Sequence, residues 1–441
     1  MKRLLSLLLC AVLALFCATT AQAAGVSITL TASEYALHYA FDAGAQDLFV
    51  ILEYATPAEK GWMMLYSADG HFEGDVSLAY SGAGGKTSVA LTSARTTGSI
   101  GKASTTLPKA ADYQKPTGKS NAKVTDFVLT ETPEGFHYAF NAIGTDYMFL
   151  YWRSKEQTVT QPVYPDENGH YEGDVVSELT FARTQFTVQV KSGSGSMKKE
   201  ATVRKGYQAP EAPQRQEGRL SGVTVCIDAG HQENGRFVNE PIGPGLTGST
   251  SGKGGMAQGT KTNRRESIVC LEIGMLLRDE LLRQGANVVM TREDQTTFHT
   301  NIERCEIAEA GGAQIMLRLH CNNSSNRSKR GIQVYGPLNS DYAKAVADAD
   351  TYREMGQKLL DAMKTRVGMT LANSTGMVRL NDNYVGNNWA KMMCFLVEMG
   401  YLSNPAEEYL LVTPVYQQWL AEGMADGVYE IAVARGWVQA Q

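Results

Sequence analysis

Val223-Thr-Val-Cys-Ile-Asp-Ala-Gly-His231 is a short, apolar, β-rich run that ends in a metal-capable side chain. Two other runs share this character: Gln314-Ile-Met-Leu-Arg-Leu-His320 ends in a histidine, and Met393-Cys-Phe-Leu-Val-Glu398 ends in a glutamate. Glu266 adds a second carboxylate at the start of a helical pattern. In an open α/β sheet, the ligand site lies beyond the carboxyl ends of the strands. We therefore expect these two histidines and two glutamates to meet at one edge of a sheet.

The pattern around these runs is typical of an α/β domain. From about Leu220, β-rich runs alternate with segments whose apolar residues recur at helical spacing. The expected strands are 223–227, 287–291, 314–319, 332–335 and 393–397, and the expected helices are 266–283, 301–310, 341–366 and 415–434. Such alternation implies a doubly wound domain with a mostly parallel sheet. We place this domain at residues 220–437, after a Pro- and Gln-rich linker at 207–219.

The N-terminal half contains an internal repeat. Leu37-His-Tyr-Ala-Phe-Asp42 recurs as Phe136-His-Tyr-Ala-Phe-Asn141, and Gly70-His-Phe-Glu-Gly-Asp75 recurs as Gly169-His-Tyr-Glu-Gly-Asp174, both at an offset of 99 residues. A shared offset of this size indicates a duplicated domain. Short alternating strands separated by Gly, Asn, Asp and Pro turns predict a small β-sandwich in each copy. We therefore expect two tandem β-sandwich-like repeats at residues 25–108 and 122–206.

The N-terminus has the features of a secretory signal. Lys2 and Arg3 precede an apolar core from Leu4 to Ala18, and Ala21-Gln22-Ala23 is a small-x-small cleavage site. An N-terminal membrane anchor is the alternative interpretation. We expect residues 1–23 to be removed and the mature protein to act outside the cytoplasm, secreted or in the cell envelope. No later segment is long and apolar enough to predict a membrane span.

Composition narrows the possible functions. The 441 residues are 43% hydrophobic and 20% charged, which is typical of a soluble globular protein of two or three domains. A formal net charge of −5 and the lack of a basic stripe argue against a nucleic-acid partner. The five cysteines beyond the signal show no disulfide framework, so we expect mostly free, buried thiols. These are Cys226, Cys270, Cys305, Cys321 and Cys394.

Each candidate site residue, considered alone, also has a purely structural interpretation. His231 would be a structural or surface histidine, Glu266 a first-turn acid favoured by the helix dipole, and Glu398 a salt-bridged acid. Cys321 would point away from His320 on a strand, which argues against a cysteine nucleophile. Together, however, His231, Glu266 and His320 would leave zinc one open position for water. A carboxylate such as Glu398, beside an apolar wall, should have a raised pKa suited to acid/base work.

Residues from about 222 to 435 resemble the zinc-dependent N-acetylmuramoyl-L-alanine amidases of the amidase-3 type. The resemblance rests on segments in the family's order: Asp228-Ala-Gly-His231, Glu266, Val289-Met-Thr-Arg292 with Asp294, Leu319-His-Cys-Asn322, Gly331-Ile-Gln-Val-Tyr335 and Leu396-Val-Glu-Met-Gly-Tyr-Leu-Ser-Asn404. It implies a three-layer α/β/α fold, Zn²⁺ held by His231, Glu266 and His320, and Glu398 as the catalytic acid/base. It also implies supporting roles for Asn322 and Arg379.

The implied reaction is hydrolysis of the amide between N-acetylmuramic acid and L-alanine of the peptidoglycan stem peptide. A stem-peptide endopeptidase would share the fold and metal, and a non-catalytic wall-binding protein is the other alternative. The Gly-, Ser- and Thr-rich segment between His231 and Glu266 is unusually long, and we expect it to shape a substrate groove or to act as a lid.

The function of the repeats stays open between wall-glycan binding and plain spacing. His38, His71, His137 and His170 recur with Asp75 and Asp174, which allows a metal site per repeat, although packing or turn roles are simpler. Aromatic residues such as Tyr39, Phe41, Tyr138, Phe140, Tyr151 and Trp152 should lie mostly in the core, with an exposed subset available to stack on sugar rings. We expect the protein to be a monomer.

Overall fold

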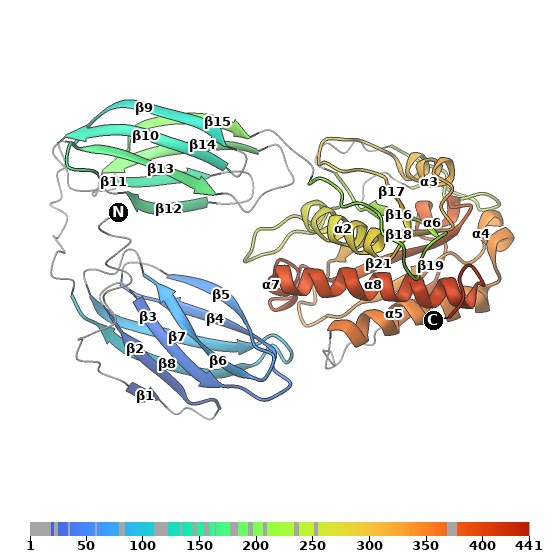
Figure 1. Ribbon diagram of the computed structural model, residues 1–441, viewed down its shortest axis with the longest axis horizontal. Coiled ribbons are helices and arrows are strands. Elements are labelled where there is room, and N and C mark those ends of the chain that lie inside the picture. Colours follow the sequence, from blue (N-terminus) through green and yellow to red (C-terminus); the bar gives the residue numbers. More distant parts are fainter. Residues whose placement is uncertain are drawn as a thin grey trace.

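The computed structural model shows two β-rich repeats and a C-terminal α/β domain (Figure 1). It describes residues 19–21, 25–33, 36–57, 60–78, 84–109, 122–132, 135–143, 148–153, 158–163, 165–176, 184–192, 197–205, 210–232, 238–250, 255–367 and 377–440. Of the expected signal segment, only 19–21 falls inside these ranges. Within the described part of the chain, no helix combines the length and the apolarity needed to cross a bilayer.

Repeat 1, the first copy of the duplicated sequence, is built from two antiparallel sheets. One has the order β1-β2-β3-β6 and the other β5-β4-β7-β8. Apolar side chains from both sheets form a single buried cluster that includes Leu30, Leu37, Leu52 and Leu91. The strands are β1 (Thr19–Ala21), β2 (Ile28–Ala32), β3 (Ala36–Asp42), β4 (Phe49–Ala55), β5 (Lys60–Tyr66), β6 (His71–Ser77), β7 (Gly85–Ser93) and β8 (Ser99–Leu107).

Repeat 2 has its own core and the strand plan of repeat 1, except that its described residues include no counterpart of β1. Its sheets have the orders β13-β10-β9 and β12-β11-β14-β15, and its core includes Phe136, Leu150, Trp152 and Val190. The strands are β9 (Lys123–Thr132), β10 (Gly135–Ile143), β11 (Met148–Arg153), β12 (Thr158–Val163), β13 (His170–Val176), β14 (Thr184–Ser192) and β15 (Met197–Lys205).

A shared irregularity fixes the alignment of the two repeats. The pairing register shifts between Leu91 and Thr92 where β7 meets β8, and between Val190 and Lys191 where β14 meets β15. These positions differ by the same 99 residues as the sequence motifs. A bulge at equivalent places in both copies is a retained structural feature rather than a local accident.

The C-terminal domain is a six-stranded sheet with helices on its faces. The sheet order is β17-β16-β18-β21-β19-β20, from β16 (Thr224–Ala229), β17 (Asn287–Met290), β18 (Ile315–Asn322), β19 (Gln333–Gly336), β20 (Met377–Leu380) and β21 (Met393–Tyr401). Every pairing is parallel except that of β19 with β21. The sheet is therefore mixed but mostly parallel, as the alternating pattern predicts.

The longer helices follow the predicted segments, with one segment split in two, whereas two short helices, Val385–Trp389 and Glu407–Leu410, were not predicted. The helices are α2 (Glu266–Arg283), α3 (Asn301–Ala310), α4 (Asp341–Val346), α5 (Ala349–Val367), α6 (Val385–Trp389), α7 (Glu407–Leu410) and α8 (Pro414–Ala434). The single helix expected at 341–366 was wrong. Ala347 is extended, and the Asp348 carboxylate accepts a hydrogen bond from the Thr351 amide, so a new helix begins there.

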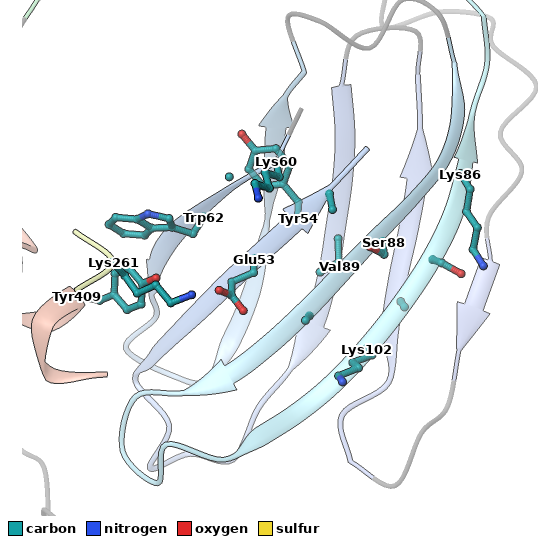
Figure 2. A pocket seen from close by; sticks show the side chains of 15 residues that line it. Glu53, Tyr54, Lys60, Trp62, Lys86, Ser88, Val89, Lys102, Lys261 and Tyr409 are labelled. Carbon is teal, nitrogen blue, oxygen red and sulfur yellow. The ribbon is translucent and has the colours of Figure 1, made fainter. Parts of the chain in front are cut away.

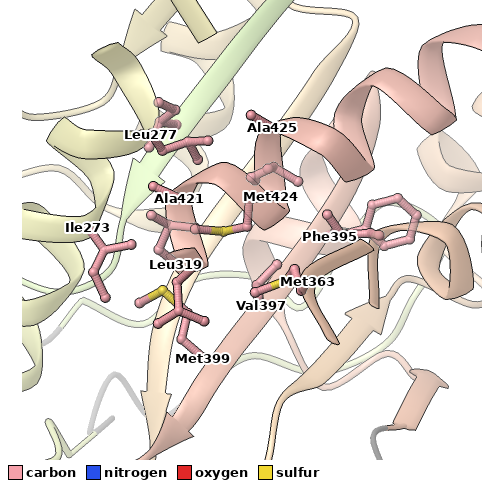
Figure 3. Close-up of a cluster of buried hydrophobic side chains, with 14 of the residues drawn as sticks. Ile273, Leu277, Leu319, Met363, Phe395, Val397, Met399, Ala421, Met424 and Ala425 are labelled. Atoms are coloured by element: carbon pink, nitrogen blue, oxygen red, sulfur yellow. The ribbon is translucent and has the colours of Figure 1, made fainter. Parts of the chain in front are cut away.

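Helices α2 and α8 pack together against one face of the sheet. Ile273 and Leu277 of α2 lie beside Met424 of α8, over Leu319 of β18 and Val397 of β21 (Figure 3). These strand residues are fully buried, which explains why their sequence is continuously apolar instead of alternating. This core holds the strand ends that carry the candidate site.

The outer face of sheet β5-β4-β7-β8 of repeat 1 packs against α7 and α8. Phe49 is only 2% exposed and contacts the rings of Tyr416 and Trp419 edge-on, at centroid distances of 5.9 and 5.2 Å. Ile51 packs with Ala406 and Tyr409. Repeat 1 therefore shares a hydrophobic interface with the C-terminal domain.

Candidate active site

The expected site residues lie at the carboxyl ends of three neighbouring strands. His231 directly follows β16, His320 lies near the end of β18, and Glu398 lies in β21. His320 is the register partner of Glu398, so the two side chains stand on the same face of the sheet. Glu266 is the first residue of α2, which packs on the opposite face over Leu319, and its carboxylate reaches the site from the start of the helix. The structure thus brings together the four residues that the sequence pattern singled out.

The backbone around His231 is arranged to admit the His320 ring. A Cβ at Gly230 would lie 2.5 Å from His320 Cε1 and 2.7 Å from its Nδ1, so a larger residue would displace the imidazole. His231 itself has a φ of 57°, a left-handed conformation that is uncommon for a residue with a Cβ. Such strained backbone is typical of functional sites because the surrounding structure must maintain it.

Three donor atoms converge at the centre of this site. His231 Nε2 lies 3.1 Å and His320 Nδ1 lies 3.0 Å from Glu266 Oε1, and the ligand atoms of all three residues lie within 4.8 Å of one another. In a tetrahedral zinc site with bonds of about 2.0–2.2 Å, neighbouring ligand atoms are roughly 3.3–3.5 Å apart. The donor set and its spacing therefore fit a zinc ion.

Glu266 is held ionised in a buried position. Burial raises its pKa, but the hydrogen bonds from His231 and His320 outweigh that effect and hold the pKa well below its usual range. The amides of Ala257 and Cys321 donate to its two carboxylate oxygens, at 2.7 and 3.1 Å. Burial lowers the pKa of His320, although the hydrogen bond to Glu266 opposes this shift. A lowered pKa favours the neutral ring that a metal ligand requires.

Two buried polar atoms beside this cluster lack protein partners. They are His320 Nε2 and Glu398 Oε2, and neither has a hydrogen-bond partner among the described residues. Burying an unpaired polar atom is costly, so such atoms mark places where a ligand or water is expected. Both atoms belong to side chains that line one cavity with His231 and Glu266.

Glu398 has the pKa of a proton carrier near neutral pH. Desolvation in the cavity, together with the nearby Glu266 charge, raises the pKa of Glu398 to about 8. The sequence predicts this direction from a carboxylate at a strand end beside an apolar wall. A carboxyl group that titrates near the working pH can both accept and return a proton.

A network of charged residues beneath the site fixes the end of β16. Asp228 is fully buried and forms ion pairs with Arg304 and Arg318. Burial opposes ionisation of Asp228, but the two arginine charges hold its pKa well below the usual range. Arg292 donates to the carbonyl oxygens of Ala229, Gly230 and Ser267, which ties the strand end to the first turn of α2.

The site opens into a cavity of ≈ 820 Å³. Asn322 lines this cavity, whereas Arg379 is exposed on β20 and is not among the lining residues that the structure describes. The family pattern therefore placed one of the two supporting candidates at the cavity. Phe298, His299 and Tyr384 also line the cavity, and sequence reasoning missed them because they lie in loops or at a helix start without a periodic signal.

The described part of the long segment after His231 is hydrogen-bonded to the rest of the domain. Glu240 is buried and accepts hydrogen bonds from the amides of Asn301 and Ile302 at the start of α3. The Trp389 indole donates to the Pro241 carbonyl, and the Asn388 amide donates to that of Ile242. Residues 233–237 and 251–254 of this segment lie outside the described ranges. The described part shapes the cavity wall through Val238, Glu240, Thr250, Gly255, Met256 and Ala257.

The cysteine thiols are buried, although Cys321 is among the residues that line the cavity. All five cysteines beyond the expected signal are free and buried. Cys321 is hydrogen-bonded to the thiol of Cys270 on α2, and burial raises the pKa of the Cys321 thiol well above its usual value. A thiol in this state is a poor nucleophile.

The histidines that recur in the two repeats form ion pairs with acidic residues at the surface. His38 contacts Asp75 and Glu73, and His71 contacts Asp42 and Glu73. Repeat 2 repeats this arrangement around Glu172. Among the described residues, the only cluster with metal-ligand spacing is that of His231, Glu266 and His320. The histidine side chains are therefore exposed or partly exposed instead of packed in a core, and the turn role that the sequence also allowed fits His71 and His170, which directly follow turns or bends.

Comparison with known proteins agrees with this geometry. Residues 225–430 match the family model described as N-acetylmuramoyl-L-alanine amidase, Amidase_3. The C-terminal half of the chain is an Amidase_3 domain. This amidase domain contains all four residues of the candidate site.

Among curated relatives, a germination-specific N-acetylmuramoyl-L-alanine amidase of Bacillus subtilis is 26% identical over 231 residues, which cover 49% of this chain and 83% of the relative. The probable cell wall amidase LytH of Staphylococcus aureus is 27% identical over 218 residues, covering 48% of this chain and 60% of LytH. Among solved structures, the amidase Ami1 of Mycobacterium smegmatis is 17% identical with a TM-score of 0.43, covering 49% of this chain and all of that one.

Proposed function

We propose that this protein is an exported, zinc-dependent N-acetylmuramoyl-L-alanine amidase. Its substrate would be peptidoglycan, and the bond cleaved would join the lactyl group of N-acetylmuramic acid to L-alanine of the stem peptide. The Amidase_3 domain and the printed activity of the Bacillus subtilis relative support the reaction. The observation that carries the proposal is the meeting of the His231, Glu266 and His320 donors with Glu398 in one cavity.

The residues of the site would have separate roles in the reaction. His231, Glu266 and His320 would hold the zinc ion, which when bound supplies a Lewis acid that polarises the carbonyl and activates water. Glu398 would take a proton from the attacking water on its carboxylate. It would then give that proton to the nitrogen of the leaving L-alanine, so that a carboxylate and an amine are formed. Asn322 would help to orient the substrate from the cavity wall.

The rest of the chain would comprise an export signal, two β-sandwich-like domains and a linker. Residues 1–23 would be a cleaved signal, and residues 25–108 and 122–206 two β-sandwich-like domains. A linker at 207–219 would lead into the catalytic domain at 220–437. Two antiparallel sheets around a single core in each repeat support the sandwich assignment. We also propose a monomer, in which repeat 1 packs against the C-terminal domain of the same chain through Phe49 and Ile51.

The proposal can be tested by mass spectrometry of purified peptidoglycan after digestion with the mature protein. We expect stem peptides with a free L-alanine amine, and their loss in Glu398→Gln. The surface variant Glu354→Gln, on the exposed side of α5, should digest normally. Metal analysis should find about one zinc per chain, and much less in His320→Ala.

Other products would contradict the proposal. Fragments cut within the stem peptide would identify an endopeptidase. Wall binding without any soluble product, and without zinc in the purified protein, would identify a non-catalytic wall protein. Normal digestion by Glu398→Gln would exclude this residue as the proton carrier.

A further inference from the structure

A second hollow lies on repeat 1, where its outer sheet meets the C-terminal domain. It has a volume of ≈ 780 Å³ and lies over strands β4, β5, β7 and β8, with Lys261 and Tyr409 of the C-terminal domain at one end (Figure 2). It is separate from the catalytic cavity, because the two share no lining residue. Its place at a domain junction is typical of ligand sites.

Strand register explains why this part of the sheet is hollow. One cross-strand row reads Trp62, Glu53, Ala90 and Lys102, and the next reads Lys60, Ala55, Ser88 and Ser104. Three of the four middle positions therefore carry small side chains, and three of the four ends carry long ones. The same sheet face farther along carries Phe49 and Ile51, which the C-terminal domain covers. The face is thus apolar where it docks and hollow where it stays open.

The hollow is positively charged. Lys60, Lys86, Lys102 and Lys261 line it, with Glu53 as the one carboxylate among its described residues. Within the described part of the chain, none of the four ammonium groups forms an ion pair with a carboxylate. Unpaired cations gathered around a concave surface attract anionic ligands. The chain as a whole is acidic, so this local excess of lysine is not a reflection of composition.

An aromatic wall adds a surface suited to sugar rings. Trp62 is 39% exposed, and its ring lies 4.2 Å from that of Tyr409, centroid to centroid. Figure 2 shows the indole at the edge of the hollow, beside Lys261 and Glu53. A large, rigid ring with one face packed and part of its surface open can contact the apolar face of a saccharide.

One loop connects this hollow to the catalytic cavity. Met256 and Ala257 line the catalytic cavity, and Lys261 lines the hollow on repeat 1. Four residues of chain span at most roughly 14 Å, so the two sites are near neighbours. The buried Glu408 carboxylate accepts hydrogen bonds from the Lys261 amide and the Thr260 hydroxyl, at 2.8 and 3.1 Å, which holds this loop against α7.

We propose that this hollow binds a further segment of the peptidoglycan substrate, through stem-peptide carboxylates and a sugar ring, while the catalytic cavity holds the bond to be cleaved. The lysines match the carboxylates in charge, Trp62 matches a sugar ring in shape, and the loop keeps both sites on one surface. Repeat 1 would then be part of the substrate-binding surface. The identity of the ligand rests on the proposed amidase function, whereas the binding itself does not.

The test is sedimentation of the full-length mature protein with insoluble peptidoglycan sacculi. Glu398→Gln is present in every sample to prevent digestion. We expect Lys86→Glu with Lys102→Glu to weaken binding roughly tenfold at low salt, and less as salt increases. Lys123→Glu with Lys199→Glu changes the net charge equally at exposed positions of repeat 2 and should bind like the parent protein.

The outcomes separate this proposal from the amidase assignment. Undiminished binding by the Lys86/Lys102 variant would overturn the proposal, as would an equal loss in the Lys123/Lys199 control. Binding that disappears when sacculi are stripped of phosphate polymers by hydrofluoric acid would assign the hollow to those polymers instead. Product analysis of the unmodified protein tests the amidase separately, so selective binding can stand even if that activity is absent.

Discussion

The two repeats share a core but differ on the outer face of one sheet. Leu52 and Leu91 in repeat 1 occupy the same places as Leu150 and Val190 in repeat 2, and both pairs are fully buried. On the opposite face, Glu53, Ala90 and Lys102 in repeat 1 correspond to Tyr151, Gln189 and Glu200 in repeat 2.

This difference lies in the outward-facing residues of the duplicated domain. The inward residues must fill one core and so stay apolar, whereas the outward residues can change without loss of the fold. In repeat 2, Glu200 stands where repeat 1 has Lys102, and the Gln189 amide donates to it. Among the described residues, only repeat 1 combines an apolar docking surface with a basic hollow.

The largest expected effect concerns the docking surface. Phe49→Ala should lower the free energy of unfolding by about 3–5 kcal/mol, because it leaves a cavity against Tyr416 and Trp419. Phe149→Ala, on the half-buried outer face of repeat 2, should cost about 1 kcal/mol. Denaturant unfolding followed by tryptophan fluorescence measures both. Equal losses would mean that both outer faces are docked.

The second effect is a pH dependence at the same interface. Glu407 follows the interface residue Ala406, and burial raises its pKa to about 7, although hydrogen bonds from the amides of Tyr401 and Gly331 oppose this. The folded protein therefore binds more protons than the unfolded chain between about pH 4.5 and 7. Stability should fall by about 3 kcal/mol as pH rises through this window.

Glu407→Gln should reduce the total fall by about 3 kcal/mol and leave the part that the raised pKa of Glu398 contributes, while the exposed Glu354→Gln should retain the full fall. Chemical denaturation at several pH values between 4 and 8 provides the measurement. An unchanged slope in Glu407→Gln would assign the pH dependence to another group. Arg330 lies close to Glu407 and donates to the Ala94 carbonyl of repeat 1, so this carboxyl group is near the docked repeat, and repeat 2 should show no equivalent effect.

Much of the catalytic domain could be predicted from its sequence because its signals are local. The helices at 266–283 and 301–310 have the predicted bounds, since apolar spacing and, for the second, a Thr300–Glu303 capping box define them. The four site residues could be singled out because each closes an apolar β-rich run or begins a helical pattern. Placing chemical residues at element ends is a strong constraint in an α/β sheet.

Other features depend on contacts that no local pattern encodes. The short strand β20 and helices α6 and α7 lack a long periodic signal, so they were missed. The hollow on repeat 1 arises only when Lys102 of β8, Glu53 of β4 and Lys261 of a distant loop meet. Sequence periodicity separates inner from outer strand residues, but it does not show which outer face another domain covers.

A smaller effect tests the aromatic contact at the edge of the docking surface. Trp62→Thr introduces the residue that repeat 2 has at this place. In a double-mutant cycle with Tyr409→Leu, the coupling free energy should be about 0.5–1.5 kcal/mol, as for other aromatic pairs. Thermal and denaturant unfolding of the four proteins gives the coupling. A value near zero would show that Trp62 does not stabilise docking, leaving it free to serve the ligand.

The smallest effect concerns the histidine–carboxylate ion pairs that both repeats retain. His71 pairs with Asp42 in repeat 1, whereas its equivalent His170 faces Asn141 in repeat 2. The hydrogen bond to Asp42, with a smaller contribution from Glu73, raises the pKa of His71 above its usual value. Asp42→Asn converts the pair to that of repeat 2 and should lower the NMR titration midpoint of His71 toward about 6.5.

The sign of this effect follows from linkage. Because the pKa is raised in the folded protein, the contribution of His71 to stability is complete below about pH 6.5 and is lost as pH rises through the folded pKa. The His38 resonance is an internal control, since Asp42→Asn leaves its contacts with Asp75 and Glu73 in place. An unmoved His71 midpoint would assign the raised pKa to Glu73, which has an equivalent in Glu172. The histidine–carboxylate pairs of the two repeats would then be alike. The divergence of the repeats would lie in the sheet β5-β4-β7-β8, which packs against the C-terminal domain, and in its counterpart in repeat 2.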